Sequence, residues 1–99
     1  MSEVQDGTCP LCKTAAKVQD HVVRRSRHYI CQSCGELVVK YFAEDWLRAK
    51  APDRARQDFS AEAKGCSSGN VYFISQSRGA DGTQHTVGKC LPLAEALGL

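Results

Sequence analysis

The sequence contains two closely spaced pairs of cysteines, Cys9-Pro10-Leu11-Cys12 and Cys31-Gln32-Ser33-Cys34, with the 18 residues 13–30 between them. Two residues between cysteines allow one tight turn to direct both sulfurs at a single ion. A tetrahedral Zn²⁺ ion takes four such thiolates at Zn–S distances of about 2.3 Å. The separation of the two pairs is typical of a four-cysteine zinc site. We therefore expect Cys9, Cys12, Cys31 and Cys34 to bind one structural zinc ion.

The residues that follow each pair bear on this prediction. Gly35 directly follows Cys34, where a metal-binding turn commonly needs a glycine with a positive φ. Lys13 holds the equivalent place after Cys12, so the first turn lacks that glycine. The alternative is a pair of redox-active Cys-x-x-Cys motifs or disulfides, which the paired spacing makes the weaker interpretation.

The pattern C-P-x-C … C-x-x-C-G over residues 9–42 resembles the zinc-ribbon superfamily and covers about a third of the chain. The resemblance implies that the four cysteines are the metal ligands and that a small antiparallel sheet surrounds them. Zinc ribbons serve in transcription, translation, recombination and protein assembly. The resemblance therefore predicts a metal and leaves the role of the protein open.

The composition predicts a thin hydrophobic core. The chain has 99 residues, of which 42% are apolar, but many of these are alanine and six are cysteine. A chain of this size buries roughly 60–65% of its unfolded surface, so a thin core usually needs a metal or disulfides. The longest run of large apolar residues, 71–74, is too short for a membrane-spanning helix of about 20 residues. The N-terminus has no apolar stretch typical of a secretory signal, so we expect a cytoplasmic (intracellular) protein without a membrane partner.

The sequence pattern predicts an α+β fold. We expect residues 1–7 to be disordered and residues 8–42 to form the ribbon, with a third strand over residues 37–42. Residues 43–51 and 53–64 favour two helices, because they are rich in helix-forming residues and Pro52 separates them. Residues 71–75 and 84–89 favour a C-terminal β-hairpin. Residues 43–99 would then be an extension that packs on the ribbon within a single compact domain.

The charge distribution points to one local surface feature. The net charge of +2 is too small for a strong overall attraction to nucleic acid. Arg24, Arg25 and Arg27 cluster with His28 at the expected hairpin tip between the cysteine pairs. Basic side chains at a rigid tip can contact phosphates, so these four residues are candidate nucleic-acid contacts. A solvated turn and a protein interface are the alternatives, since arginine is also enriched at interfaces.

Cys66 and Cys90 lie outside the ribbon. We expect both to be buried or unused thiols, reduced in an intracellular protein, because free cysteine is among the most buried residue types. A second metal site formed by Cys66, Cys90 and His85 is the weaker interpretation, because these residues lack the paired spacing of the four-cysteine site. A reversible disulfide becomes possible only if the two cysteines lie at adjacent strand ends, with Cα atoms about 4.4–6.8 Å apart.

Several functions remain open at this point. We expect no enzyme, because a closed four-cysteine zinc site has no open position for water or substrate. The leading hypothesis is a small intracellular adaptor or regulator that binds a protein partner through residues 43–99. Nucleic-acid binding by the hairpin tip is the alternative, and a rubredoxin-like iron electron carrier is a third. A homodimer formed through residues 71–75 as an edge strand is also consistent with the pattern.

Overall fold

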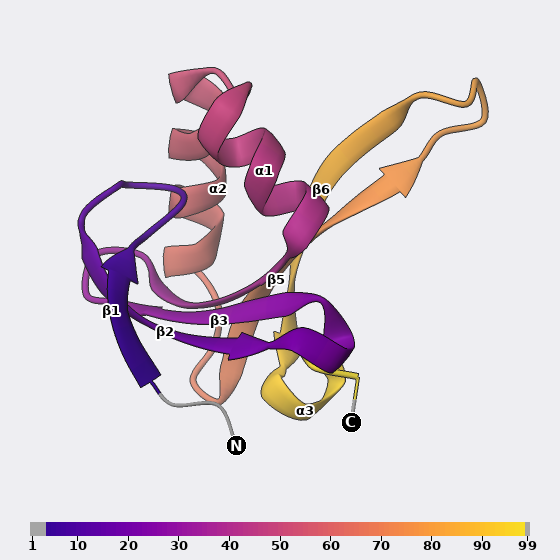
Figure 1. Cartoon of the computed structure of the whole chain (residues 1–99). Coiled ribbons are helices and arrows are strands. Elements are labelled where there is room, and N and C mark those ends of the chain that lie inside the picture. The colour runs from indigo at the N-terminus through magenta and orange to yellow at the C-terminus, as the bar shows by residue number, and fades with distance from the viewer. Residues whose placement is uncertain (1–3, 99) are drawn as a thin grey trace.

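The computed structural model describes residues 4–98 and contains one six-stranded sheet with helices on both faces (Figure 1). The strands lie in the order of the sequence: β1 (Val4–Thr8), β2 (Ala15–His21), β3 (Ser26–Cys31), β4 (Gly35–Lys40), β5 (Asn70–Arg78) and β6 (Gln84–Pro92). The helices are the short 3₁₀ helix η1 (Val22–Arg24), α1 (Tyr41–Ala49), α2 (Asp53–Lys64) and the single-turn α3 (Leu93–Ala96). The predicted α+β class and C-terminal hairpin agree with this architecture.

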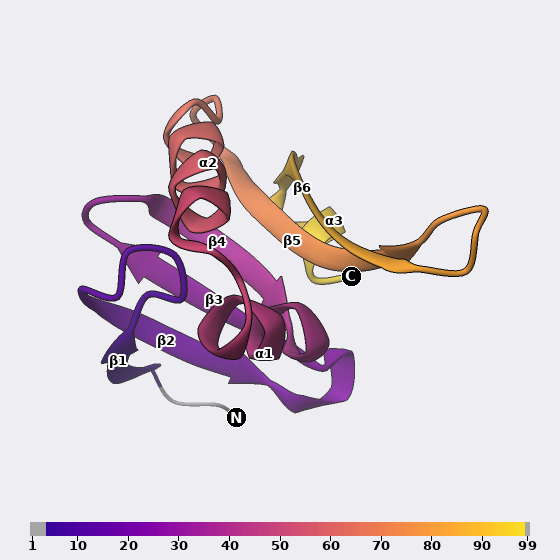
Figure 2. The same ribbon diagram turned by 90° about the horizontal axis from the view of Figure 1, so that it is seen from above.

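One strand pair differs from all the others. β4 and β5 are parallel, with Leu37 opposite Tyr72, whereas every other neighbouring pair is antiparallel. Parallel neighbours need a crossover connection, and α1 and α2 supply it. Both helices cover the same face of the sheet, as the view from above shows (Figure 2). The crossover therefore joins the cysteine-rich half of the chain to the C-terminal hairpin within one sheet.

The sheet has a buried cluster on each face. The larger cluster lies under α1 and α2 and includes Leu37, Leu47 and Ile74, all fully buried. The smaller cluster joins Val38 and Val71 to α3 on the opposite face. Alternate residues of β4 and β5 point to opposite faces, so both strands are buried on both sides.

The ends of several elements differ from the prediction. Residues 4–7 belong to β1 and pair with β2, although the sequence predicted disorder; residues 1–3 lie outside the described part. The predicted third strand ends at Lys40, and Tyr41 and Phe42 begin α1 instead. Its partner strand β3 begins only at Ser26, because Arg25 before it adopts a left-handed turn conformation with φ +51°. The Tyr41 N–H, which has no acceptor within the first turn of α1, donates to the carbonyl oxygen of Arg25 at 2.9 Å.

The place of β5 overturns the predicted dimer contact. β5 lies between β4 and β6, so residues 71–75 are not an edge strand. Its side chains Val71, Tyr72 and Ile74 are buried, because β4 pairs with it on one side and helices cover both faces. Within the described residues, the open edges of the sheet are β1 and β6.

The far end of the β5–β6 hairpin extends beyond the rest of the molecule (Figures 1 and 2). Its turn is closed by the Gly79 N–H, which donates to the carbonyl oxygen of Thr83 at 2.8 Å. Among residues 4–98, no helix has the length and apolar composition needed to cross a membrane.

The base of this hairpin generates a prediction about Gly88. A Cβ atom at Gly88 would overlap the phenol ring of Tyr72, which crosses diagonally from the neighbouring strand. Gly88→Ala should therefore lower the free energy of unfolding by about 1–3 kcal/mol through overpacking. Chemical denaturation measures the effect. Gly65→Ala is the control, because the nearest atom to its Cβ would be a carbonyl oxygen at 3.4 Å. Equal effects at the two sites would contradict the packing seen here.

Candidate metal centre

The four paired cysteines converge on one point. Cys9 and Cys12 lie in the turn between β1 and β2, and Cys31 and Cys34 lie at the turn between β3 and β4. All four Sγ atoms lie within 4.8 Å of one another. The Cys9–Cys34 Sγ–Sγ distance is 3.8 Å and the Cys12–Cys31 distance is 3.4 Å. Sulfurs at the corners of a tetrahedron, each about 2.3 Å from a metal, are about 3.8 Å apart. The cluster could therefore hold one metal ion.

The backbone of both turns adopts the conformation that such a cluster requires. Gly35 has φ +92°, and Lys13 has φ +61° at the equivalent place. The first turn is closed by the Cys9 N–H, which donates to Thr14 O at 2.9 Å, and by the Lys13 N–H, which donates to Cys9 O at 2.9 Å. In the second turn, the Cys34 amide donates to the Cys31 sulfur at 3.4 Å. The glycine expected after Cys34 is thus needed for its positive φ.

The four thiols differ in their surroundings. Cys9 and Cys34 are 0% exposed, and burial raises the pKa of both thiols. The partial burial of Cys12 also opposes ionisation, but hydrogen bonds from Thr14 and Cys31 outweigh it and lower the pKa of Cys12 to about 6. The Ser60 hydroxyl lies 3.1 Å from the Cys34 sulfur, so α2 contributes a hydrogen bond to the centre. A cation that binds all four thiolates would offset the cost of ionising the buried pair.

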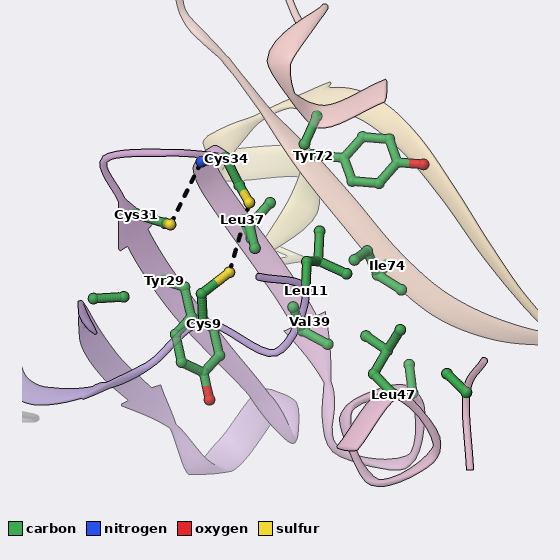
Figure 3. Close-up of a cluster of buried hydrophobic side chains, with 14 residues drawn as sticks. Cys9, Leu11, Tyr29, Cys31, Cys34, Leu37, Val39, Leu47, Tyr72 and Ile74 are labelled. Carbon is green, nitrogen blue, oxygen red and sulfur yellow. Dashed lines mark hydrogen bonds between the residues drawn. The ribbon is translucent and has the colours of Figure 1, made fainter. Parts of the chain in front are cut away.

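The cysteine cluster is continuous with the larger hydrophobic cluster. Leu11, between the first two cysteines, is buried with Leu37 of β4 in the same group of side chains. Figure 3 shows the sulfurs of Cys9 and Cys34 directed toward one another beside Leu37. The site and the core of the protein therefore form one packed unit.

The four candidate nucleic-acid contacts do not lie together on the surface. Arg24 and Arg25 are exposed in the turn formed by η1. Arg27 forms an ion pair with the buried Glu44 of α1. His28 is buried, and its Nε2 atom lies 3.1 Å from a carboxylate oxygen of Glu36. Of the four side chains, Arg24 and Arg25 are thus exposed, Arg27 is partly exposed and His28 is buried.

Glu44 is the centre of a polar network that the sequence did not indicate. It is buried at the base of α1, pairs with Arg27 and Arg48, and accepts a hydrogen bond from the hydroxyl of Tyr29. Burial and the hydrogen bond to Glu44 raise the pKa of Tyr29 to about 12. The network fixes α1 on β3, next to the turn that carries Arg24 and Arg25, which we call the basic turn.

The sequence also gave no role to Phe42, which was expected in a strand. As the second residue of α1, its side chain is 66% exposed. The signal that could have found it is the helix-forming stretch directly after it, since an aromatic residue can occupy the first turn of a helix as readily as the end of a strand.

Cys66 and Cys90 form a disulfide, with Cα atoms 5.6 Å apart. The expectation of two unused, reduced thiols is therefore wrong, and so is a metal site that these sulfurs would share with His85. The bond joins the residues after α2 to β6. The partners become neighbours only through the pairing of β5 with β6, which places Cys90 opposite Tyr72 and is not visible in cysteine spacing.

No protein-family model, curated protein or solved structure matches this chain. The similarity to zinc ribbons thus rests on the cysteine pattern and on the geometry of the cluster.

The conformation of Lys13 leads to a prediction. A non-glycine residue in the left-handed region costs about 1–2 kcal/mol. Glycine avoids this cost, but it loses more conformational entropy on folding, and that loss cancels part of the gain. Lys13→Gly should therefore raise the free energy of unfolding of the metal-loaded protein by about 1 kcal/mol. Lys17→Gly, within β2, should instead lower it by about 0.5–1 kcal/mol. Denaturant titrations compare the two, and a loss of stability at Lys13 would contradict the proposed turn geometry.

The disulfide leads to a second prediction. The double variant Cys66→Ala/Cys90→Ala should lose about 3 kcal/mol of stability, because the bond closes a loop with a sequence separation of 24. Its metal content should be unchanged, since neither sulfur belongs to the cluster. Thermal unfolding and elemental analysis measure the two quantities. Mass spectrometry of the unreduced protein that finds two further free thiols would contradict the bond.

Proposed function

We propose that this chain is a small zinc-ribbon-like protein in which Cys9, Cys12, Cys31 and Cys34 hold one structural Zn²⁺, and that it acts as a protein-interaction adaptor. The observation that carries the proposal is the convergence of four sulfurs to within 4.8 Å. Four cysteine ligands complete the tetrahedral shell of zinc. The ion then has a structural role: it holds the fold together, and the surface of the folded protein binds the partner.

The burial of the site supports a structural ion. Cys9 and Cys34 are inaccessible to solvent, and the cluster is continuous with the core. A catalytic zinc site instead keeps one position open to water or substrate. The proposal is therefore a binding protein and not an enzyme.

The side chains at the hairpin tip favour a protein partner over nucleic acid. Arg27 and His28 already pair with Glu44 and Glu36, so a phosphate would have to compete with these carboxylates for them. The same turn exposes two aliphatic side chains, Val22 and Val23. Aliphatic groups gain from burial against a protein and add nothing to a phosphate contact.

Metal analysis of freshly purified, reduced protein tests the zinc site. We expect about one zinc per chain. A strong chelator or Cys31→Ser should unfold the cysteine-rich half, because structural zinc contributes about 10–16 kcal/mol against a net stability of about 5–15 kcal/mol. The loss of chemical-shift dispersion in an NMR spectrum measures this unfolding.

The matched control is Ser33→Ala, which changes an exposed residue within the same turn and no ligand. It should keep both the zinc and the native spectrum. A red protein containing iron would favour the rubredoxin-like electron carrier. A native spectrum in metal-free protein would show that the core is sufficient without an ion.

A further inference from the structure

The start of α1 presents an aromatic side chain to solvent between two hollows. Phe42 is 66% exposed, whereas Ala43 and Leu47 of the same helix are fully buried. One hollow, of about 280 Å³, is lined by Arg24, Arg25, Lys40, Phe42, Ser75 and Gln76. The second, of about 510 Å³, lies against Phe42, Trp46 and Gln76. Phe42 and Gln76 border both, so the hollows form one continuous surface that we call the Phe42 surface.

The charged side chains that line the smaller hollow of the Phe42 surface are all basic. Among the described residues, its lining includes Arg24, Arg25 and Lys40 and no acidic side chain. The larger hollow has Asp45 and Lys50 at its border, which balance each other. A partner therefore gains most from negative charge on the side of the basic turn.

The basic turn is held in place by α1. The Tyr41 N–H donates to Arg25 O at 2.9 Å, and the Lys40 ammonium donates to Arg24 O at 2.8 Å. Both contacts use main-chain oxygens of the arginines, and within residues 4–98 no ion pair engages their guanidinium groups. A site fixed in this way loses little conformational entropy when a partner binds.

The apolar part of the surface identifies the kind of partner. Val22 and Val23, which directly precede the two arginines on the same turn, are 66% and 92% exposed. Apolar anchors with an arginine rim are typical of protein interfaces. Hollows on both sides of Phe42 suit protruding side chains, whereas a membrane surface offers none.

We propose that the Phe42 surface binds an acidic peptide segment of a protein partner. Apolar side chains of that segment occupy the hollows on either side of Phe42, and its carboxylates face Arg24, Arg25 and Lys40. This inference rests on the proposed adaptor function and specifies the chemistry of its partner.

Selection from a library of random dodecapeptides displayed on phage, with the intact zinc-loaded protein as bait, tests the proposal. We expect enriched peptides to combine apolar residues with Asp or Glu. A synthetic copy of an enriched peptide should bind about tenfold or more weakly to Phe42→Ala and to Arg24→Glu/Arg25→Glu. Its affinity should also fall with added salt. Arg54→Glu, at an exposed position of α2 outside both hollows, should leave it unchanged.

Other outcomes would overturn the proposal. Peptide binding that is insensitive to Phe42→Ala and Arg24→Glu/Arg25→Glu would place the partner elsewhere and leave the adaptor function intact. Arginine-dependent binding of a labelled oligothymidylate or of phosphatidylserine vesicles, with no peptide selected, would assign the surface to nucleic acid or to a membrane. Dimerisation in sedimentation experiments that Phe42→Ala abolishes would assign it to a second copy. Elemental analysis of the same samples tests the zinc site separately. A protein that contains no zinc would contradict the metal proposal, whatever the peptide-binding result.

Discussion

The convergence of four cysteine sulfurs is the constraint on which the rest of this structure depends. It brings together two turns that are separated by the whole β2–β3 hairpin, and so fixes how β1–β2 and β3–β4 meet. Cys9 and Cys34 are buried among the side chains of the main core, and Ser60 brings α2 into contact with the Cys34 sulfur. Burial raises the pKa of the Cys9 and Cys34 thiols, so both stay neutral unless a cation offsets the cost of ionising them. The four sulfurs are close enough to hold one metal ion, which would supply that charge.

The C-terminal half is held by different means. β5 joins the sheet through its parallel pairing with β4, and the Cys66–Cys90 disulfide ties β6 to the end of α2. The single turn of α3 covers the second face of the sheet. The four-cysteine cluster and the disulfide thus lie in opposite halves of the chain. The surface around Phe42 lies where α1, the basic turn and β5 meet, so its shape depends on both halves.

The sequence predicted the features that local patterns determine. Two Cys-x-x-Cys motifs identified four side chains that do come together, and the glycine after Cys34 does adopt a positive φ. The two main helices were visible in composition and in Pro52. What could not be predicted depends on contacts between distant residues. The strand expected to continue through Phe42 ends at Lys40, because its partner β3 begins only at Ser26, after the left-handed turn at Arg25. In the same way, Arg27 pairs with the buried Glu44 of α1, and Cys90 lies near Cys66 because β6 pairs with β5.

We propose a structural metal ion within the core and a binding role for the adjacent surface. X-ray absorption spectroscopy at the zinc edge of the purified protein tests the central claim most directly, because it reports the ligands of the ion itself. Four sulfur neighbours at about 2.3 Å are the predicted result. A spectrum with nitrogen or oxygen neighbours in place of one or more sulfurs, or a protein with no zinc to measure, would contradict the account.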